Sequence, residues 1–233
     1  KTRFGNTGNI LDFENLTKEN IYVLESPVLS NSQFEKFLNF FKKNIKILDC
    51  TFNIEENLKE RLEKLCFEAE IAVREGAKHL VLTDKEINQK KAQIPMILAI
   101  GAVNSRLTNL GIRGFVSINV QTSEALDTHS FAVLLGVGAT TINPYIALDS
   151  IYQRHEKKLF GKLNFEECIY KYVKSIDNGL LKIMSKMGIS VLSAYRGGCN
   201  FESVGLSRAL VSKYFPGMVS RISGIGIFGI EKK

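Results

Sequence analysis

Short apolar segments alternate with helical segments through the middle of this 233-residue chain. The predicted strands cover residues 45–50, 79–84, 115–120 and 139–142, and a segment with helical periodicity follows each of them. Strands and helices that alternate in this way form parallel sheets, because each helix returns the chain to the start of the next strand. Helices then cover both faces of the sheet, which explains why these strands are nearly all apolar. The sequence therefore predicts an α/β fold.

Two architectures fit four such units. They make half of a (βα)8 barrel or an open doubly wound sheet. A complete barrel takes about 250 residues, and this chain uses both of its ends for other segments. We therefore expect an incomplete, barrel-like sheet or an open doubly wound sheet.

The remaining segments complete a single α/β domain over residues 1–233. Residues 1–30 have weak periodicity and are predicted to be an irregular lead-in, and residues 31–153 hold the βα units. Residues 154–233 are predicted to hold a long helix capped by Asn164, a last strand over 189–192, and a C-terminal extension. The extension is expected to contain short helices near Val204 and Leu210. The chain starts without Met and its tail is apolar and Gly-rich, so we expect it to be excised from a larger multidomain enzyme.

Composition excludes several classes of protein. The formal charge is +7, but the lysines are scattered among glutamates, so no basic arm for nucleic acid is predicted. No apolar run approaches the roughly 20 residues that span a bilayer, so no membrane association is predicted. The four cysteines form no CxxC pair and no zinc-type cluster, which is typical of reduced thiols in a cytoplasmic protein. No histidine lies in a catalytic motif.

Polar residues at the predicted strand ends form one constellation that could carry function. The carboxyl ends of parallel strands meet at one edge, where ligands bind in this fold class. The same residue types also cap helices and shape turns in βα loops, and that role is the commoner one. The positions at this edge are Asp49 and Thr51, Thr83 and Asp84, Asn119 and Gln121, Asn143, and Tyr195 with Arg196.

Glycine-rich turns suggest a different function. Backbone N–H groups of Gly197-Gly198 or Gly136-Val137-Gly138 could cradle a phosphate group, although neither turn has the spacing of a known nucleotide motif. This alternative predicts a self-contained, barrel-like enzyme that binds a phosphate-bearing ligand at the Gly197-Gly198 turn. A third possibility is an anion-binding module that uses the positive charge.

Several segments, in order along nearly the whole chain, resemble the central domain of the large (alpha) subunit of glutamate synthase. They are ESPVLSN at 25–31, IPMILAIGAV at 94–103, HSFAVLLGVGA at 129–139, NPY at 143–145, LKIMSKMGIS at 181–190, YRGG at 195–198, FESVGL at 201–206 and SRISGIG at 220–226.

The resemblance implies a multidomain oxidoreductase of glutamate biosynthesis. In that enzyme a glutamine amidotransferase domain precedes the central α/β domain, and a barrel with FMN and an iron–sulfur cluster follows, then a β-helix. Glutamine is hydrolysed in the first domain, and ammonia passes through a tunnel to 2-oxoglutarate. The resulting imine is reduced at FMN to L-glutamate.

For this chain the resemblance implies a linking role without catalytic residues, metal ligands or a bound cofactor. FMN and the iron–sulfur cluster would belong to other parts of the parent enzyme. The implied partners are the amidotransferase and FMN-binding domains of the same polypeptide, and an electron-donating small subunit where the parent uses one. The strand-end residues expected to contact these neighbouring domains are Asp49, Thr83, Gln121, Asn143 and Tyr195. The apolar tail over 222–230 would be exposed when those domains are absent.

Overall fold

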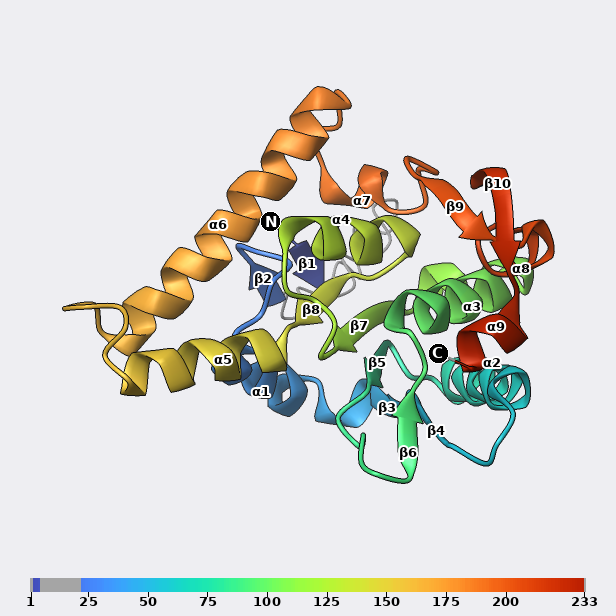
Figure 1. Ribbon diagram of the computed structural model, residues 1–233, viewed down its shortest axis with the longest axis horizontal. Helices are drawn as coiled ribbons and strands as arrows, with labels where there is room; N and C mark the ends of the chain where they lie inside the picture. Colours follow the sequence, from blue (N-terminus) through green and yellow to red (C-terminus); the bar gives the residue numbers. More distant parts are fainter. Residues whose placement is uncertain (1, 5–21, 233) are drawn as a thin grey trace, which may run out of the picture.

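Parallel strands alternate with helices from β3 to α5 in the computed structural model of the protein, which describes residues 2–4 and 22–232 (Figure 1). The strands are β1 (Thr2–Phe4), β2 (Tyr22–Leu24), β3 (Ile45–Asp49), β4 (Thr51–Asn53), β5 (His79–Thr83), β6 (Lys91–Gln93), β7 (Ser117–Gln121), β8 (Thr141–Asn143), β9 (Glu202–Leu206) and β10 (Val219–Ile225). The helices are α1 (Asn31–Phe40), α2 (Leu58–Arg74), α3 (Met96–Asn109), α4 (Thr128–Val137), α5 (Tyr145–Glu156), α6 (Phe165–Lys186), α7 (Leu192–Tyr195), α8 (Arg208–Tyr214) and α9 (Ile227–Glu231), with short 3₁₀ turns η1 (Lys42–Asn44) and η2 (Arg113–Phe115).

The central sheet contains four parallel strands in the order β3-β5-β7-β8. This confirms the predicted α/β fold. The spatial order follows the sequence order, as it does in a barrel, and the reversal of order that defines a doubly wound sheet is absent from these four strands. This strand order favours the incomplete, barrel-like alternative, and the four strands do not close into a barrel.

Both faces of this sheet are covered. Helices α2, α3 and α4 lie side by side against one face, where Leu80 and Leu82 of β5 join the main core. Val81 points to the opposite face, as alternation along a strand requires. There it meets an aromatic cluster from α1 and the β1–β2 pair, with Phe37 fully buried at its centre.

Long-range pairing adds structure that local patterns did not predict. Strands β1 and β2 pair within the segment expected to be irregular, and Val28 forms a parallel bridge with Ile142 at the outer edge of β8. Strands β4 and β6 form a small antiparallel arm beyond the ends of β3 and β5. Residues 5–21 of the predicted lead-in lie outside the described residues.

The prediction of a strand over 189–192 is wrong. Gly188 ends α6 with a positive φ, and the N–H of Ile189 then donates to the carbonyl of Met184, so this segment caps α6. Helix α7 starts at once, at Leu192. The short helix expected near Val204 is also wrong, because Val204 lies in β9, whereas Leu210 does lie in a helix, α8.

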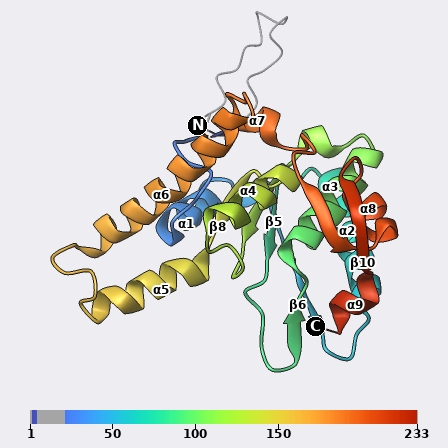
Figure 2. The same cartoon turned by 45° about the horizontal axis from the view of Figure 1, so that its top comes forward.

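Different elements flank the central sheet on its two sides. Helices α5 and α6 extend to one side, and β9, β10, α8 and α9 gather beside α2 and α3 on the other (Figures 1 and 2). Among the described residues, no helix combines the length and the apolar character that crossing a membrane would need.

Candidate functional site

Four of the five predicted site residues end adjacent strands of the central sheet. Asp49, Thr83, Gln121 and Asn143 are the last residues of β3, β5, β7 and β8, and each is the register partner of the next. The sequence therefore identified a real row of side chains at the carboxyl edge of the sheet.

Hydrogen bonds join three members of this row directly. The Thr83 hydroxyl donates to Gln121 Oε1 over 3.0 Å, and Gln121 Nε2 donates to Asn143 Oδ1 over 3.1 Å. Asn143 is fully buried, and its Nδ2 donates to the Leu29 carbonyl and to Asn31 Oδ1, both at 3.0 Å. These side chains use each other as partners, and together they tie the sheet to the segment that begins α1.

The segment from Pro27 to Leu29 runs along the outer edge of β8. The N–H of Ile142 donates to the Pro27 carbonyl over 2.8 Å, and the N–H of Leu29 donates to the Ile142 carbonyl over 2.9 Å. Part of the ESPVLSN motif therefore acts as a short extra strand that covers the open side of β8.

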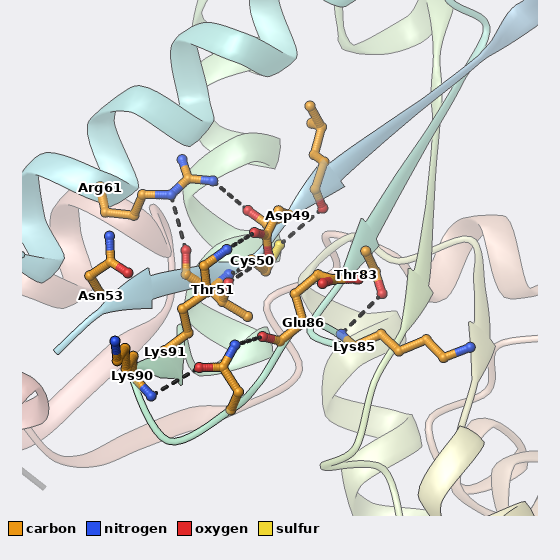
Figure 3. A network of polar contacts seen from close by, with 12 residues as sticks. Asp49, Cys50, Thr51, Asn53, Arg61, Thr83, Lys85, Glu86, Lys90 and Lys91 are labelled. Atoms are coloured by element: carbon orange, nitrogen blue, oxygen red, sulfur yellow. Dashed lines mark hydrogen bonds and ion pairs between the residues drawn. The ribbon is translucent and has the colours of Figure 1, made fainter.

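Asp49 belongs to a second network at the other end of the row, drawn in Figure 3. Its Oδ1 accepts from the N–H and the hydroxyl of Thr51, at 2.9 and 2.8 Å, and its Oδ2 lies 3.5 Å from Lys91 Nζ. The buried Arg61 of α2 donates from Nε to the Thr51 carbonyl over 3.1 Å and from Nη2 to the Asp49 carbonyl. A guanidinium thus fixes the turn between β3 and β4.

Asp84 is the most strongly bonded carboxylate at this edge. The sequence placed it at a strand end, but not among the five residues expected to contact other domains. It is fully buried, and it accepts from the Thr122 hydroxyl at 2.8 Å and from the N–H and hydroxyl of Ser123 at 2.9 and 3.0 Å. Burial, together with Asp84, raises the pKa of Tyr145 to about 12. The position of Asp84 directly after the buried strand β5 was the one sequence signal for its role. In the structure, Asp84 joins the loop after β5 to the loop after β7.

Glu124 supplies a cap that sequence reasoning missed. Helix α3 follows Pro95, which offers no capping side chain, and Glu124 Oε2 instead accepts from the N–H of Met96 over 2.6 Å. Burial is the main cause that raises the pKa of Glu124, although the Met96 bond acts against it. Because the two residues are 28 positions apart, only the folded loop brings the carboxylate to the helix N-terminus.

Tyr195 does not belong to this row. The strand expected before it is absent, and Tyr195 lies in α7, where it is 1% exposed and contacts Phe201 edge to face. Burial raises the pKa of its hydroxyl. The side chain acts as a packing residue between α7 and the core.

The Gly197-Gly198 turn offers no free cradle for phosphate. The N–H of Gly197 donates to the Gly136 carbonyl over 2.8 Å, and the N–H of Gly198 donates to the Tyr195 carbonyl over 3.3 Å. Both amides that the alternative function would need are therefore engaged in holding the turn against α4.

FMN and the iron–sulfur cluster, the cofactors that the resemblance implies for the larger enzyme, do not match the residues described in this chain. Within residues 2–4 and 22–232, no three His, Cys, Asp or Glu side chains gather as metal ligands would. The four cysteines are free and lie in separate segments of the chain. Burial raises the pKa of Cys66 to about 11, which disfavours a ligating thiolate. These residues do not match an iron–sulfur cluster, and the engaged Gly197-Gly198 amides do not match the phosphate of FMN.

Comparison with known proteins gives a consistent result. The family model for the glutamate synthase central domain matches residues 1–207. The chain is 52% identical over 236 residues to the glutamate synthase [NADPH] large chain of Azospirillum brasilense, 39% over 212 residues to that of Bacillus subtilis, and 38% over 242 residues to the chloroplastic ferredoxin-dependent glutamate synthase of Spinacia oleracea.

These matches cover 100%, 90% and 97% of this chain. They cover only 16%, 14% and 15% of the relatives, so the chain corresponds to about one sixth of a glutamate synthase large chain. The resemblance inferred from the sequence motifs is confirmed. The chain belongs to the glutamate synthase central domain family.

Proposed function

We propose that this chain is the central linking domain of a glutamate synthase large chain. It would connect the glutamine amidotransferase domain to the FMN-binding barrel and help to wall the path of ammonia between them. The parent reaction would be the reductive synthesis of L-glutamate from L-glutamine and 2-oxoglutarate. The chain itself would supply rigidity and spacing, and it would not turn over substrate alone.

The internal bonding of the carboxyl edge carries this proposal. In α/β enzymes this edge holds the ligand and leaves polar groups free to bind it. Here Thr83, Gln121 and Asn143 bond to one another, and Asp84 bonds to Thr122 and Ser123. An edge whose polar groups are already paired suits a scaffold better than an active site.

Within this row, Asp49 is the best candidate for contact with a neighbouring domain. Its side chain is 35% exposed and that of Lys91 is 37% exposed, whereas Asn143 is fully buried. Thr83, Gln121 and Asn143 would then position this surface from beneath. Tyr195 would support such a contact only through the packing of α7.

The partners and compartment follow from the same proposal. The relatives carry NADPH, ferredoxin and NADH in their names, so the family accommodates different electron donors. An electron-donating small subunit is a proposed partner of the parent enzyme, and four free cysteines are compatible with a cytoplasmic location.

The linking role can be tested in the full-length large chain by measuring glutamine hydrolysed per glutamate formed. If Asp49 helps to seat a neighbouring domain, Asp49→Ala should at least double this ratio because ammonia would escape. Asp149→Ala is the matched control, since Asp149 is exposed on α5 and outside the edge. The control should leave the ratio unchanged.

Two outcomes would contradict the proposal. The first is formation of glutamate from glutamine by the isolated 233-residue chain. The second is stoichiometric retention of FMN by that chain after dialysis, as judged by flavin absorbance. Either result would show that the chain carries a catalytic site of its own.

A further inference from the structure

A cavity of about 430 Å³ lies between helices α2, α3 and α8, and none of the strand-end residues lines it. Helix α3 packs against both of the other helices (Figure 1). Helix α8 also packs on β9 and β10, parallel strands whose register shifts at two bulges. Gly101 of α3 allows the close approach of α8, because a Cβ there would lie 2.3 Å from the Phe215 ring and 2.8 Å from the Tyr214 carbonyl oxygen. The cavity is therefore fixed by helix packing, and its volume lies in the range of small-molecule sites, roughly 300–1,000 Å³.

The inner surface of this cavity is largely apolar. Leu62 of α2 and Ala102 of α3 line it and are almost fully buried. Phe67 also lines it and is 57% exposed, so its ring lies where the cavity opens to solvent. The lining positions of α3 run from 102 to 109, which corresponds to about 10 Å along the helix axis. An apolar group of that length would displace water from this surface, and its burial would favour binding.

Ser105 places a hydroxyl without a partner in this surface. Its side chain lines the cavity and is 5% exposed, yet its Oγ has no hydrogen-bond partner among the described residues. A buried hydroxyl that lacks a partner lowers stability, and such groups are uncommon in native proteins. A ligand with an oxygen acceptor would supply the missing bond. The Ser105 hydroxyl is thus an indication of ligand binding that is independent of the cavity volume.

The charged groups around the cavity favour an anion. Two cations, Arg106 and Lys213, line it together with one carboxylate, Glu63. Burial raises the pKa of Cys66, which is another lining residue. Arg106 and Lys213 lower that pKa and Glu63 raises it, so all three charges act at the same place. Two cations and one carboxylate leave the lining with one positive charge in excess.

Both cations have carboxylate partners but keep the capacity to bind a ligand. Arg106 donates to Glu70 Oε2 from Nε and Nη2, and its Nη1 makes no hydrogen bond within residues 2–4 and 22–232. Lys213 Nζ lies 3.1 Å from Glu63 Oε1, and both side chains are about half exposed. Because exposed ion pairs add little to stability, a ligand carboxylate can replace Glu63 beside Lys213 at small cost.

We propose that this cavity binds a small carboxylic acid with an apolar body, as its monoanion. The carboxylate accepts hydrogen bonds from the Ser105 hydroxyl and the Lys213 ammonium, and the apolar body covers Leu62 and Ala102. One carboxylate matches the single positive charge in excess. The site lies within this chain alone, so it does not depend on the linking role.

Calorimetric titration of the full-length large chain with 3-phenylpropionate tests the site. This probe has one carboxylate and an apolar ring, and its Kd should lie below about 1 mM. 3-Phenylpropionamide lacks the charge and acetate lacks the ring, so each should bind at least about tenfold more weakly. The absence of saturable probe binding, or equal affinity for the amide or for acetate, would overturn the proposal.

Four substitutions assign the binding to this cavity. Ser105→Ala should weaken probe binding at least about fivefold without lowering the melting temperature, because the hydroxyl has no partner to lose. Lys213→Gln should weaken it by a similar factor, and Glu63→Gln should strengthen it at least about twofold, because a competing carboxylate is removed. Lys64→Gln is the matched control, since Lys64 is exposed on α2 and does not line the cavity. Ser105→Ala and Lys213→Gln chains that bind as tightly as the control would contradict the assignment.

Alkylation of Cys66 locates the bound probe directly. At about pH 9, saturating 3-phenylpropionate should slow the reaction of Cys66 with iodoacetamide at least about threefold, as followed by mass spectrometry of its peptide. Cys199, which is exposed between α7 and β9, should react at an unchanged rate. Equal rates at Cys66 with and without the probe would place the probe elsewhere and overturn the site. These readouts measure binding alone, so failure of the linking role in the Asp49→Ala experiment would leave them unchanged.

Discussion

The two parallel sheets of this molecule follow the same βαβ rule but differ in how they are covered. The central sheet has α2, α3 and α4 on one face and α1 with β1–β2 on the other. The β9–β10 sheet has α8 on one face and solvent on the other. Parallel strands gain most of their stability from burial on both faces, so the described chain covers the first sheet fully and the second sheet on one face.

The two sheets also differ in the contacts that join their strands. In the central sheet, side chains at the carboxyl edge bond to each other across β5, β7 and β8. At the second sheet the close contact is between backbones, where Gly224 meets Gly205. The central sheet is therefore specified by a polar network, and the second sheet by glycine and by bulges.

The largest expected effect tests whether α1 completes the central sheet. Phe37→Ala removes a fully buried ring from the aromatic cluster and should lower the free energy of unfolding by about 4 kcal/mol, measured by urea denaturation. Phe115→Ala, at a ring that is 73% exposed, should cost less than about 0.5 kcal/mol. Similar losses for both variants would mean that α1 does not cover the sheet.

The polar row at the carboxyl edge should give the next largest effect. Asn143→Ala leaves Gln121 Nε2, the Leu29 carbonyl and Asn31 Oδ1 without this partner, so it should cost about 2–3 kcal/mol in the same assay. Asn109→Ala, at an exposed position that ends α3, serves as the control. A loss as small as that of the control would show that the row contributes nothing to stability.

His79 makes the covered face of the central sheet sensitive to pH. Burial and the neighbouring Lys78 lower the pKa of His79 to about 4, from about 6.5 in an unfolded chain. Unfolding therefore takes up a proton when the pH lies between these values. Stability should be full above about pH 6.5 and should fall by up to about 3 kcal/mol as the pH drops to about 4.

The pH effect is isolated by comparison with His79→Phe, which suits the surrounding rings of Phe4, Phe37 and Phe41. The variant should lose this part of the pH dependence, while His129→Gln, at an exposed position, should keep it. Parallel pH profiles for the wild-type chain and His79→Phe would contradict the assignment.

A matched pair of valines gives the smallest effect and the sharpest comparison. Val120→Ala in β7 removes a fully buried side chain and should cost about 2 kcal/mol. Val204→Ala in β9 changes a residue that is 65% exposed, so in the 233-residue chain it should cost less than about 0.5 kcal/mol. Equal costs would show that the outer face of β9–β10 is already buried without a partner.

Local signals predicted much of this fold correctly. Asn164 caps α6 in a full capping box, as the sequence predicted. The four apolar strands appear in the central sheet, and four polar residues appear at its carboxyl edge, because alternation and strand direction are encoded within a few neighbouring positions.

The misplaced elements have a common cause. The segment 189–192 has the composition of a strand but caps α6, and Val204 was assigned to a helix although a partner 18 residues away holds it in β9. Propensity is a weak guide where pairing decides the conformation. Tyr195 left the predicted row for the same reason, since no strand precedes it.

The sequence by itself determined the alternation of strands and helices, the helix ends, and the family, because these depend on nearest neighbours and on motifs in order along the chain. Only the tertiary structure decided that Asp84 joins two loops, that Glu124 caps α3, and that bulges gather Val219, Ile222 and Ile225 on one bare face. Those features depend on the distance between residues far apart in the chain, and that distance is fixed only when the burial of apolar surface brings the elements together.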